Sequence, residues 1–198
     1  VSGACFSEFG FNVTCIDTDR LKIENLKKGI IPIYEPELES LVNKNITSGR
    51  LKFSLEKKEN IKIADAIFIA VGTPARRGDG NADLSFVFDA AEEIAAYLDG
   101  YTVIVTKSTV PVGTSLKIKE IIRRKNSKAT FDVVSNPEFL REGSAIEDFM
   151  RPNRIIVGLE NKRSQDFMAR IYKPLFLFET PILYTDLKSA ELIKYASN

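Results

Sequence analysis

Short runs of apolar, often β-branched residues recur along the chain, and stretches with apolar residues at helical spacing lie between them. The short runs are apolar at most positions, which is typical of strands in a parallel sheet that helices cover on both faces. We therefore predict seven strands, at residues 12–17, 51–54, 66–71, 102–106, 131–134, 154–158 and 182–184.

Helices are predicted between these strands and at both ends of the chain. Gly29 ends one helix, Pro36 lies in the first turn of the next, and Asp83 precedes a third as its N-cap. The apolar face of that third helix is predicted to be Phe86, Ala90, Ile94 and Leu98. The predicted helices cover residues 1–10, 19–28, 36–47, 84–98, 112–125, 162–172 and 187–198. The alternation predicts an α/β fold with a Rossmann-like, doubly wound, mostly parallel sheet.

The composition narrows the class of protein. A chain of 198 residues with 44% hydrophobic residues can bury a full core, as one domain with the start of a second. The net charge of +1 favours neither nucleic acid nor a membrane surface, and no apolar run approaches the length of a transmembrane helix. We therefore expect no nucleic-acid partner and no membrane partner. Two cysteines and the lack of a signal-peptide pattern predict a cytoplasmic protein.

Histidine is absent, which excludes mechanisms built on imidazole and the usual zinc sites within this chain. Any acid–base chemistry must use Glu, Asp, Lys or Tyr, and we expect no metal. Cys5 and Cys15 lie among apolar residues and are predicted to be small core residues.

Both ends of the chain indicate a piece of a longer protein. The chain begins with Val1 rather than Met, inside a helix-like stretch rich in small residues. It ends in a helix that lacks a stop signal.

Polar clusters follow four of the predicted strands. They are Asp17, Gly72-Thr73-Pro74, Lys107-Ser108-Thr109-Val110-Pro111 and Asn136-Pro137-Glu138. Ligands of open parallel sheets bind at the carboxyl ends of the strands, so four clusters on one edge predict a single crevice. The alternatives for the second and third clusters are a simple turn and a solvated loop. The long loop at residues 72–82 is predicted to be functional or mobile.

Asp17 is an acid at the end of the second strand of a dinucleotide-binding pattern. Such an acid accepts hydrogen bonds from the ribose hydroxyls of the cofactor and repels a 2′-phosphate, which selects NAD over NADP. The alternative is that Asp17 caps the helix that follows it.

The segment Ser135-Asn136-Pro137-Glu138-Phe139-Leu140-Arg141-Glu142-Gly143 combines two carboxylates with an arginine after a buried strand. That combination predicts a site for proton transfer or polar ligand binding. The alternative is that Glu138 and Glu142 lie in the first turn of a helix, where negative charge is favoured. The last predicted helix contains Glu191, Lys194, Tyr195 and Asn198, and Lys194 and Asn198 lie on one face because they are four positions apart. The alternative to a functional role is that this face is simply exposed to solvent.

These residues together resemble the N-terminal domain of the UDP-glucose/GDP-mannose 6-dehydrogenase family. The resemblance spans essentially the whole chain, and the combination of STVPVG and NPEFLREG is highly specific for the family. The matching segments are VSGACFSEFG, VTCIDTDRLKI, IPIYEPELESLV, FIAVGTPARRGDGNADLS, VTKSTVPVGTS, VVSNPEFLREGSAIEDF, RPNRIIVG and SAELIKYASN. The segments GDGNADLS and VSGACFSEFG favour UDP-glucose over GDP-mannose as substrate.

The resemblance implies oxidation of the C6 hydroxyl of a nucleotide sugar to a carboxylate, with NAD reduced twice per turnover. A cysteine beyond this chain would trap the aldehyde as a thiohemiacetal, which is oxidised to a thioester and hydrolysed. Cys5 and Cys15 do not match the position of that cysteine.

The resemblance also assigns residues. It places Asp17 and Lys22 at the adenosine ribose, and Thr73, Pro74, Ser108, Thr109 and Glu142 along the rest of the NAD site. It places Glu138, Phe139, Leu140, Arg141, Glu142, Lys194 and Asn198 at the substrate. In catalysis, Glu138 is the acid–base residue of thioester hydrolysis and the Thr109 hydroxyl positions a water. Lys194 and Asn198 stabilise negative charge on the C6 oxygen.

The family pattern is incomplete in this chain. The first strand with its glycine-rich turn is missing, as are the second domain and the nucleophilic cysteine. We expect one NAD-binding domain over residues 1–186, and residues 187–198 to begin a central helix that holds the dimer contact of the full-length protein. We expect the chain to be inactive by itself. Three alternatives remain: a GDP-mannose or UDP-N-acetyl-sugar dehydrogenase, a methyltransferase, and a non-catalytic nucleotide-binding fragment.

Overall fold

The computed structural model describes residues 1–75 and 82–197, and the chain forms two compact α/β units. The first comprises Val1–Asn60, Phe139–Asn153 and Leu177–Thr180. The second comprises Ile61–Glu138, Arg154–Phe176 and Pro181–Asn198. One of the crossings between the units therefore falls between Glu138 and Phe139, inside a predicted site segment.

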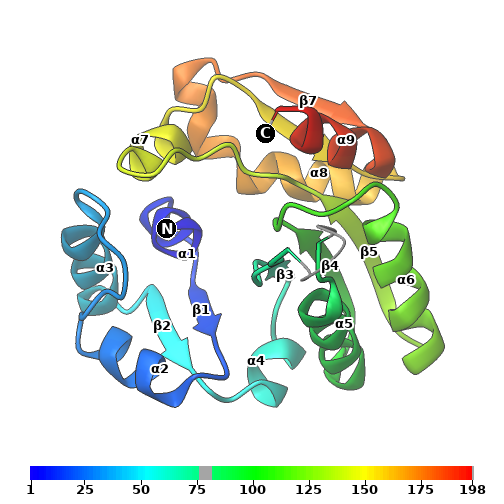
Figure 1. Ribbon diagram of the computed structural model, residues 1–198, viewed down its shortest axis with the longest axis horizontal. Helices are drawn as coiled ribbons and strands as arrows, with labels where there is room; N and C mark the ends of the chain where they lie inside the picture. Colours follow the sequence, from blue (N-terminus) through cyan, green and yellow to red (C-terminus); the bar gives the residue numbers. More distant parts are fainter. Residues whose placement is uncertain (76–81, 198) are drawn as a thin grey trace. The chain divides into compact units, whose positions relative to one another are not determined.

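The first unit is built on two parallel strands, β1 (Val13–Ile16) and β2 (Leu51–Ser54). Its helices, shown in Figure 1, are α1 (Ser2–Glu8), α2 (Arg20–Lys27), α3 (Leu38–Thr47) and α7 (Ala145–Met150). Helix α1 packs closely against β1 at Gly3. A Cβ atom on this residue would lie only 2.5 Å from the Sγ atom of Cys15. A larger residue at that position would push the helix away from the strand.

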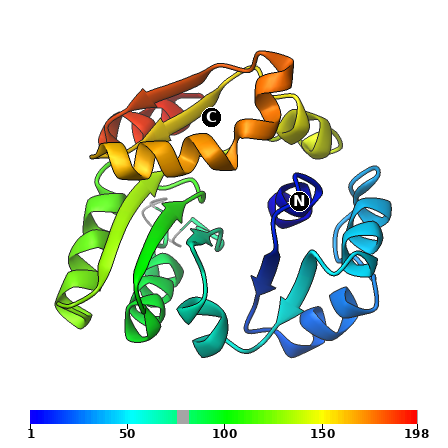
Figure 2. The same cartoon turned by 180° about the vertical axis from the view of Figure 1, so that it is seen from behind.

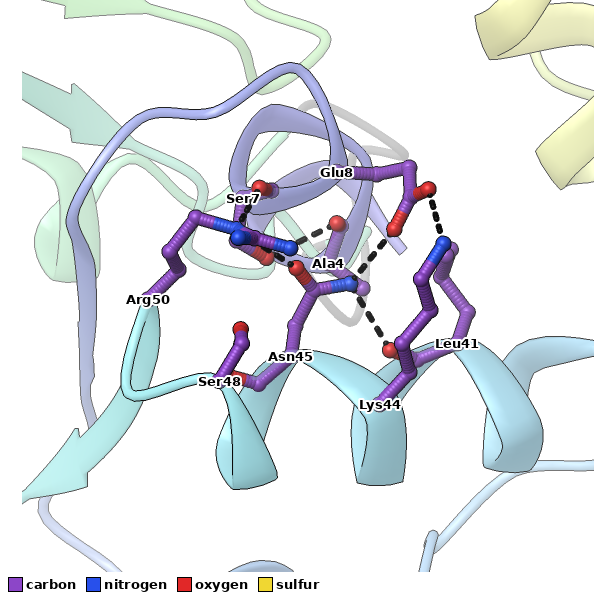
Figure 3. A network of polar contacts seen from close by, with 8 residues as sticks. All are labelled: Ala4, Ser7, Glu8, Leu41, Lys44, Asn45, Ser48 and Arg50. Carbon is purple, nitrogen blue, oxygen red and sulfur yellow. Dashed lines mark hydrogen bonds and ion pairs between the residues drawn. The ribbon is translucent and has the colours of Figure 1, made fainter.

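A polar network joins α1, α3 and the start of β2 (Figure 3). The fully buried Asn45 donates its amide to Glu8 at 2.9 Å and accepts from Nε of Arg50 at 3.3 Å. The Nε atom of Arg50 also donates to the carbonyl of Ser7, and Lys44 pairs with the second oxygen of Glu8. The hydrogen bond from Lys44 lowers the pKa of Glu8, although burial acts in the opposite direction. The network fixes two helices to one strand end without relying on apolar contact alone.

Among the described residues, the second unit has a five-stranded sheet in the order β3-β4-β5-β6-β7. Its strands are β3 (Ala66–Ile69), β4 (Tyr101–Thr106), β5 (Thr130–Ser135), β6 (Ile155–Gly158) and β7 (Ile182–Thr185). Neighbouring strands are parallel except β5 and β6, which meet antiparallel at Ser135 and Gly158. The carboxyl ends of β3, β4 and β5 therefore lie along one edge.

Helices cover both faces of this sheet (Figures 1 and 2). They are α5 (Ser85–Tyr97), α6 (Thr114–Lys125), α8 (Lys162–Ile171), α9 (Leu187–Ser197) and the 3₁₀ helix η1 (Lys173–Phe178). Helices α5 and α6 pack against each other over an apolar core, while α8 and α9 lie on opposite faces of β6 and β7. Two helices each contain a boundary between the units: α4 (Lys58–Lys62), between Asn60 and Ile61, and η1, of which Lys173–Phe176 belongs to the second unit.

The fold class and all seven predicted strands are confirmed, with strand ends that differ by at most two residues. In the doubly wound strand order, β1 and β2 correspond to the second and third strands, and β3, β4 and β5 to the fourth, fifth and sixth. Within residues 1–75 and 82–197, no strand corresponds to the first. The assignment of residues 1–186 to a single domain stays a prediction.

Several helix predictions are wrong in detail. The helix predicted at 112–125 begins at Thr114, after the N-cap Gly113, and helix α5 begins at Ser85 with Leu84 rather than Asp83 as N-cap. The helix predicted at 36–47 begins at Leu38, because Glu37 adopts a left-handed conformation with a φ of 66° and serves as N-cap. Helix α5 buries Val87, Ala91, Ile94 and Ala95, whereas Phe86 from the predicted face is 53% exposed. Both faces contain Ile94, and the sheet selects the one that runs through Val87 and Ala91. Helices α4, α7 and η1 were not predicted, since each spans at most six residues.

Residues 76–81 of the predicted functional loop and Asn198 lie outside the described residues. Within the described part of the chain, no helix has the length and apolar character needed to cross a membrane.

Replacing Asn45 by Ala should lower the free energy of unfolding by about 1–3 kcal/mol, because Leu41 and Arg50 lose a buried hydrogen-bond partner. Urea unfolding of both proteins measures the difference. Lys44→Ala, one position earlier, is the control: its side chain is 60% exposed, so its loss should cost less than about 1 kcal/mol. Equal effects of the two changes would contradict a structural role for Asn45.

Candidate functional site

Three of the four predicted clusters lie at one edge of the five-stranded sheet. Strands β3, β4 and β5 end in register, with Ile69 opposite Thr106 and Thr106 opposite Ser135. The segments that follow them contain Thr73 and Pro74, Ser108 and Thr109, and Glu138. The edge therefore brings together the predicted site residues of the second unit, apart from those on α9.

Hydrogen bonds between the first two of these loops use the hydroxyl protons of the predicted site residues. Thr73 donates its hydroxyl to the carbonyl of Thr109 at 3.0 Å, and Ser108 donates to the carbonyl of Val71 at 2.7 Å. The backbone N–H of Lys107 donates to Ile69 at 3.0 Å. A hydroxyl has one proton and two lone pairs, so Thr73 and Ser108 keep acceptor capacity for a ligand.

At the end of β5, Asn136 is 1% exposed and fully engaged. Its amide group donates to the carbonyl of Ile156 at 2.8 Å, and its oxygen accepts from the Tyr172 hydroxyl at 2.5 Å. The ammonium of Lys107, also buried, donates to the carbonyl of Asn136. Burial raises the pKa of Tyr172, the hydrogen bond with Asn136 lowers it, and the charge of Glu138 raises it further. Tyr172 therefore stays a neutral donor that fixes the start of the Asn136-Pro137-Glu138 segment.

Glu138 and Lys194 interact electrostatically in the second unit. Lys194 is 9% exposed on helix α9, and burial lowers the pKa of its ammonium group, while the charge of Glu138 raises it. Glu138 is half-buried at the end of β5. A carboxylate that follows a strand thus interacts electrostatically with a desolvated ammonium group on α9. Their predicted roles in catalysis stay predictions.

In the first unit, Asp17 follows β1 and forms an ion pair with Lys22. Its second oxygen accepts the backbone N–H of Asp19 at 3.1 Å. Burial raises the pKa of Asp17, but the hydrogen bonds from Lys22 and Asp19 outweigh it and the net shift is downward. The alternative that Asp17 caps the following helix is wrong, since Asp19 is the N-cap and accepts from the Lys22 N–H.

The segment after Glu138 belongs to the first unit and is not helical until Ala145. The alternative that Glu138 and Glu142 decorate a first helical turn is therefore wrong. Arg141 binds Asp148 through its guanidinium group at 2.7 and 3.1 Å and through its backbone N–H at 2.8 Å. This pairing raises the pKa of Arg141 and lowers that of Asp148. Glu142 is exposed.

Sequence reasoning missed the role of Glu35 at this segment. Its carboxylate accepts the N–H of Gly143 at 2.9 Å and that of Ala145 at 2.8 Å, and so caps α7 from a residue more than a hundred positions away. The grouping of all four clusters into one crevice stays a prediction, because Asp17 and the strand ends of the sheet belong to different units.

A separate hollow of ≈ 370 Å³ lies at the amino-terminal ends of β4 and β5. Its lining includes Tyr101, Asp132 and Asn161, and Asp132 already accepts from both of the others at 2.6 Å. None of the predicted site residues lines it. Among residues 1–75 and 82–197, no group of three or more Cys, Asp or Glu side chains could hold a metal ion.

The layered α/β fold, with polar side chains at the carboxyl ends of its strands, defines a nucleotide-binding protein of the Rossmann type. Residues 1–176 match the model of the NAD-binding domain of the UDP-glucose/GDP-mannose dehydrogenase family, and the chain belongs to this family.

Known members of the family are similar over the whole chain. A UDP-glucose 6-dehydrogenase of Rhizobium meliloti is 56% identical over 200 residues, which cover 100% of this chain and 46% of that protein. A solved UDP-glucose dehydrogenase of Pyrobaculum islandicum is 39% identical with a TM-score of 0.93, over 99% of this chain and 45% of that one. A GDP-mannose dehydrogenase of Pseudomonas aeruginosa is 32% identical with a TM-score of 0.94, over 100% and 46%. The chain thus spans about half the length of these relatives.

The residues of the first unit fit NAD. The lowered pKa of Asp17 keeps its carboxylate charged near neutral pH, and its side chain is 30% exposed. Carboxylate oxygens accept several hydrogen bonds each, so the contacts with Lys22 and Asp19 leave acceptor capacity for ribose hydroxyls.

Asp17→Ala in the full-length protein should weaken NAD binding by about 1.5–3 kcal/mol, the worth of a hydrogen bond to a charged group. It should also reduce the preference for NAD over NADP, because the ammonium of Lys22 loses its ion pair with Asp17 and can attract the 2′-phosphate of NADP. Fluorescence titration with both cofactors measures the two affinities. Lys22→Ala is the matched comparison and should not improve NADP binding. Unchanged affinities in Asp17→Ala would remove Asp17 from the site.

Proposed function

We propose that the protein to which this chain belongs oxidises the C6 hydroxyl of UDP-glucose to the carboxylate of UDP-glucuronate. NAD, when bound, accepts one hydride at each of the two oxidation steps. The observation that supports this most directly is the electrostatic interaction between Glu138, which follows β5, and the buried Lys194 of α9 in a NAD-binding fold. The Rhizobium meliloti relative, named as a UDP-glucose 6-dehydrogenase, supports the choice of sugar nucleotide.

For the cofactor, we assign Asp17 and Lys22 to the adenosine ribose. Thr73, Pro74, Ser108 and Thr109 line the middle of the site and Glu142 its nicotinamide end. The bonds that Thr73 and Ser108 already donate favour acceptor roles for their oxygens toward ligand hydroxyls.

For the substrate, we assign the main chain of Phe139, Leu140 and Arg141, with Glu142 beside it. The guanidinium group and the backbone N–H of Arg141 are both bound to Asp148. The carbonyl of Arg141 accepts the backbone N–H of Ser144 at 3.2 Å and keeps a second lone pair, and its guanidinium group keeps N–H donors that Asp148 does not use. The same pair holds the segment in one conformation, which reduces the entropy lost on binding.

In catalysis, Lys194 and Asn198 stabilise negative charge on the C6 oxygen as a hydride leaves the C6 carbon. Burial of Lys194 strengthens this effect, because few waters screen its charge. Glu138 serves as acid–base residue when water attacks the thioester on a cysteine beyond this chain, and the Thr109 hydroxyl positions that water. We further propose a cytoplasmic enzyme that acts as a homodimer or a higher oligomer.

A second candidate substrate is GDP-mannose, favoured by the TM-score of 0.94 to the Pseudomonas aeruginosa GDP-mannose dehydrogenase. NADH formation by the full-length protein with UDP-glucose, GDP-mannose and UDP-N-acetyl sugars, compared side by side, decides between them. A higher kcat/KM for any sugar other than UDP-glucose would overturn the proposed substrate.

Glu138→Gln in the full-length protein should slow thioester hydrolysis by about 10²–10⁴-fold, so that an acyl-enzyme accumulates after NADH has formed. Lys194→Ala should slow the earlier oxidation by about 10²–10³-fold and leave no adduct. Intact-mass spectrometry after mixing with UDP-glucose and NAD separates the two outcomes. Near-normal turnover in both variants would show that the two residues are structural.

The alkaline limb of the kcat–pH profile should lie below 10.5, the ordinary pKa of lysine, because burial lowers the pKa of Lys194. Loss of its proton as pH rises removes the charge that stabilises the alkoxide. In Glu138→Gln, where hydrolysis limits kcat, the limb is followed in the rate of the NADH burst that precedes hydrolysis, and it should lie at still lower pH, since the charge of Glu138 raises the Lys194 pKa. Lys194→Arg is the control, because guanidinium stays protonated and the limb should disappear. A limb that neither substitution moves would belong to another group.

A further inference from the structure

Glu191 on helix α9 is 2% exposed, and its carboxylate caps a different helix. One oxygen accepts the backbone N–H of Gly113 at 2.6 Å, and the other accepts that of Ser115 at 2.7 Å. Gly113 is the N-cap of α6, which begins at Thr114. Two short, charge-assisted hydrogen bonds therefore join the middle of α9 to the first turn of α6.

Helix α6 needs this external cap because of its own sequence. Gly113 has a φ of +95°, a conformation that favours glycine, and glycine has no side chain to accept the N–H groups of the first turn. A carboxylate at this point also interacts favourably with the positive end of the helix dipole. The hydroxyl of Ser115 is hydrogen-bonded to Thr106 at 2.9 Å, so the capped turn is itself fixed to the end of β4.

The same contact determines where Lys194 lies. Glu191 and Lys194 are three positions apart on α9 and both belong to its buried face. The start of α9 has a second anchor at Gly158 of β6, where a Cβ atom would lie 2.6 Å from the Cβ of Ala190 and 2.7 Å from the carbonyl oxygen of Asp186. Gly158 sets the distance of the helix from the sheet, and Glu191 sets its position relative to the loop that contains Thr109.

We propose that Glu191 is a positioning residue for the oxidation step, acting through Lys194, which it holds against the strand ends by capping α6. The inference rests on the proposed role of Lys194 in the full-length enzyme. Displacement of a catalytic group by about 1 Å can cost about 10²-fold in rate, so a remote cap can control turnover.

The carboxylate is specific for this task. Two N–H groups point at it, one toward each oxygen, so a carboxylate satisfies both in this arrangement. Glutamine of equal size offers one oxygen, and its NH₂ group would face the second N–H. Aspartate keeps both oxygens but is one methylene shorter, so α9 must move toward α6 to retain the bonds.

The test is a double-mutant cycle in the full-length enzyme, with kcat measured at saturating UDP-glucose and NAD. Glu191→Gln should lower kcat by about 10–10²-fold, and Lys194→Ala by about 10²–10³-fold. The double variant should be no slower than Lys194→Ala alone to within about twofold, because the two residues act as one unit. General destabilisation would instead multiply the two losses.

Glu120→Gln is the matched control: it removes an exposed carboxylate from α6 that pairs with Lys117 on the same helix, and kcat should not change. If Glu191→Gln does not fold, Glu191→Asp takes its place in the cycle with an expected loss of about tenfold. A normal kcat in the Glu191 variant, or a fully multiplicative loss in the double variant, overturns this inference alone. A normal kcat in Lys194→Ala overturns the proposed function and this inference together.

Discussion

The bond between the Glu191 carboxylate and the first turn of α6 is the constraint on which the candidate site of the second unit depends. The turn follows the loop of Ser108 and Thr109, and the helix that supplies the carboxylate also contains Lys194. Buried N–H groups without an acceptor cost about 1–3 kcal/mol each, so the α6 turn and α9 cannot separate without a substantial loss of stability. The buried Glu191 thus couples the loop of Ser108 and Thr109, which is proposed to line the NAD site, to Lys194, which is proposed to stabilise the alkoxide.

The first unit uses the same chemical solution at Glu35. There, too, a carboxylate from a distant part of the chain accepts the N–H of a glycine and of the residue two positions later. Gly143 and Gly113 both have positive φ values, of +81° and +95°. In both places the N-cap residue, Gly113 for α6 and Ser144 for α7, makes no side-chain hydrogen bond to the first turn, and a distant carboxylate accepts the N–H groups instead. The Glu35 cap and the Arg141–Asp148 pair together fix the segment proposed to hold the substrate.

This arrangement explains which features could be predicted from the sequence. The strands depend on local apolar runs, and all of them were predicted; Asp17, Glu138 and Lys194 could be selected because they follow strands or match a specific family motif. The caps could not, because Glu191 lies 78 residues from Gly113 and Glu35 lies 108 residues from Gly143. No local pattern contains both partners. The prediction of the buried face of α5 failed for a related reason. Ile94 belongs to two possible apolar faces of the helix, and only packing against the sheet decides which of them is buried.

The existing hydrogen bonds also limit what the predicted site residues of each unit can bind. Thr73, Ser108 and the N–H of Arg141 have donated their protons within the protein, and Asn136 is satisfied by Tyr172 and Ile156. What remains toward a ligand is acceptor capacity, on the hydroxyl oxygens of Thr73 and Ser108 in the second unit and on the carboxylate of Asp17 in the first. Sugar hydroxyls are donors that match such acceptors. Lys194 differs from these groups because it is a cation whose charge is poorly solvated in its buried position. An oxygen that gains negative charge in the transition state would therefore interact with Lys194 more strongly than the neutral hydroxyl of the bound substrate does.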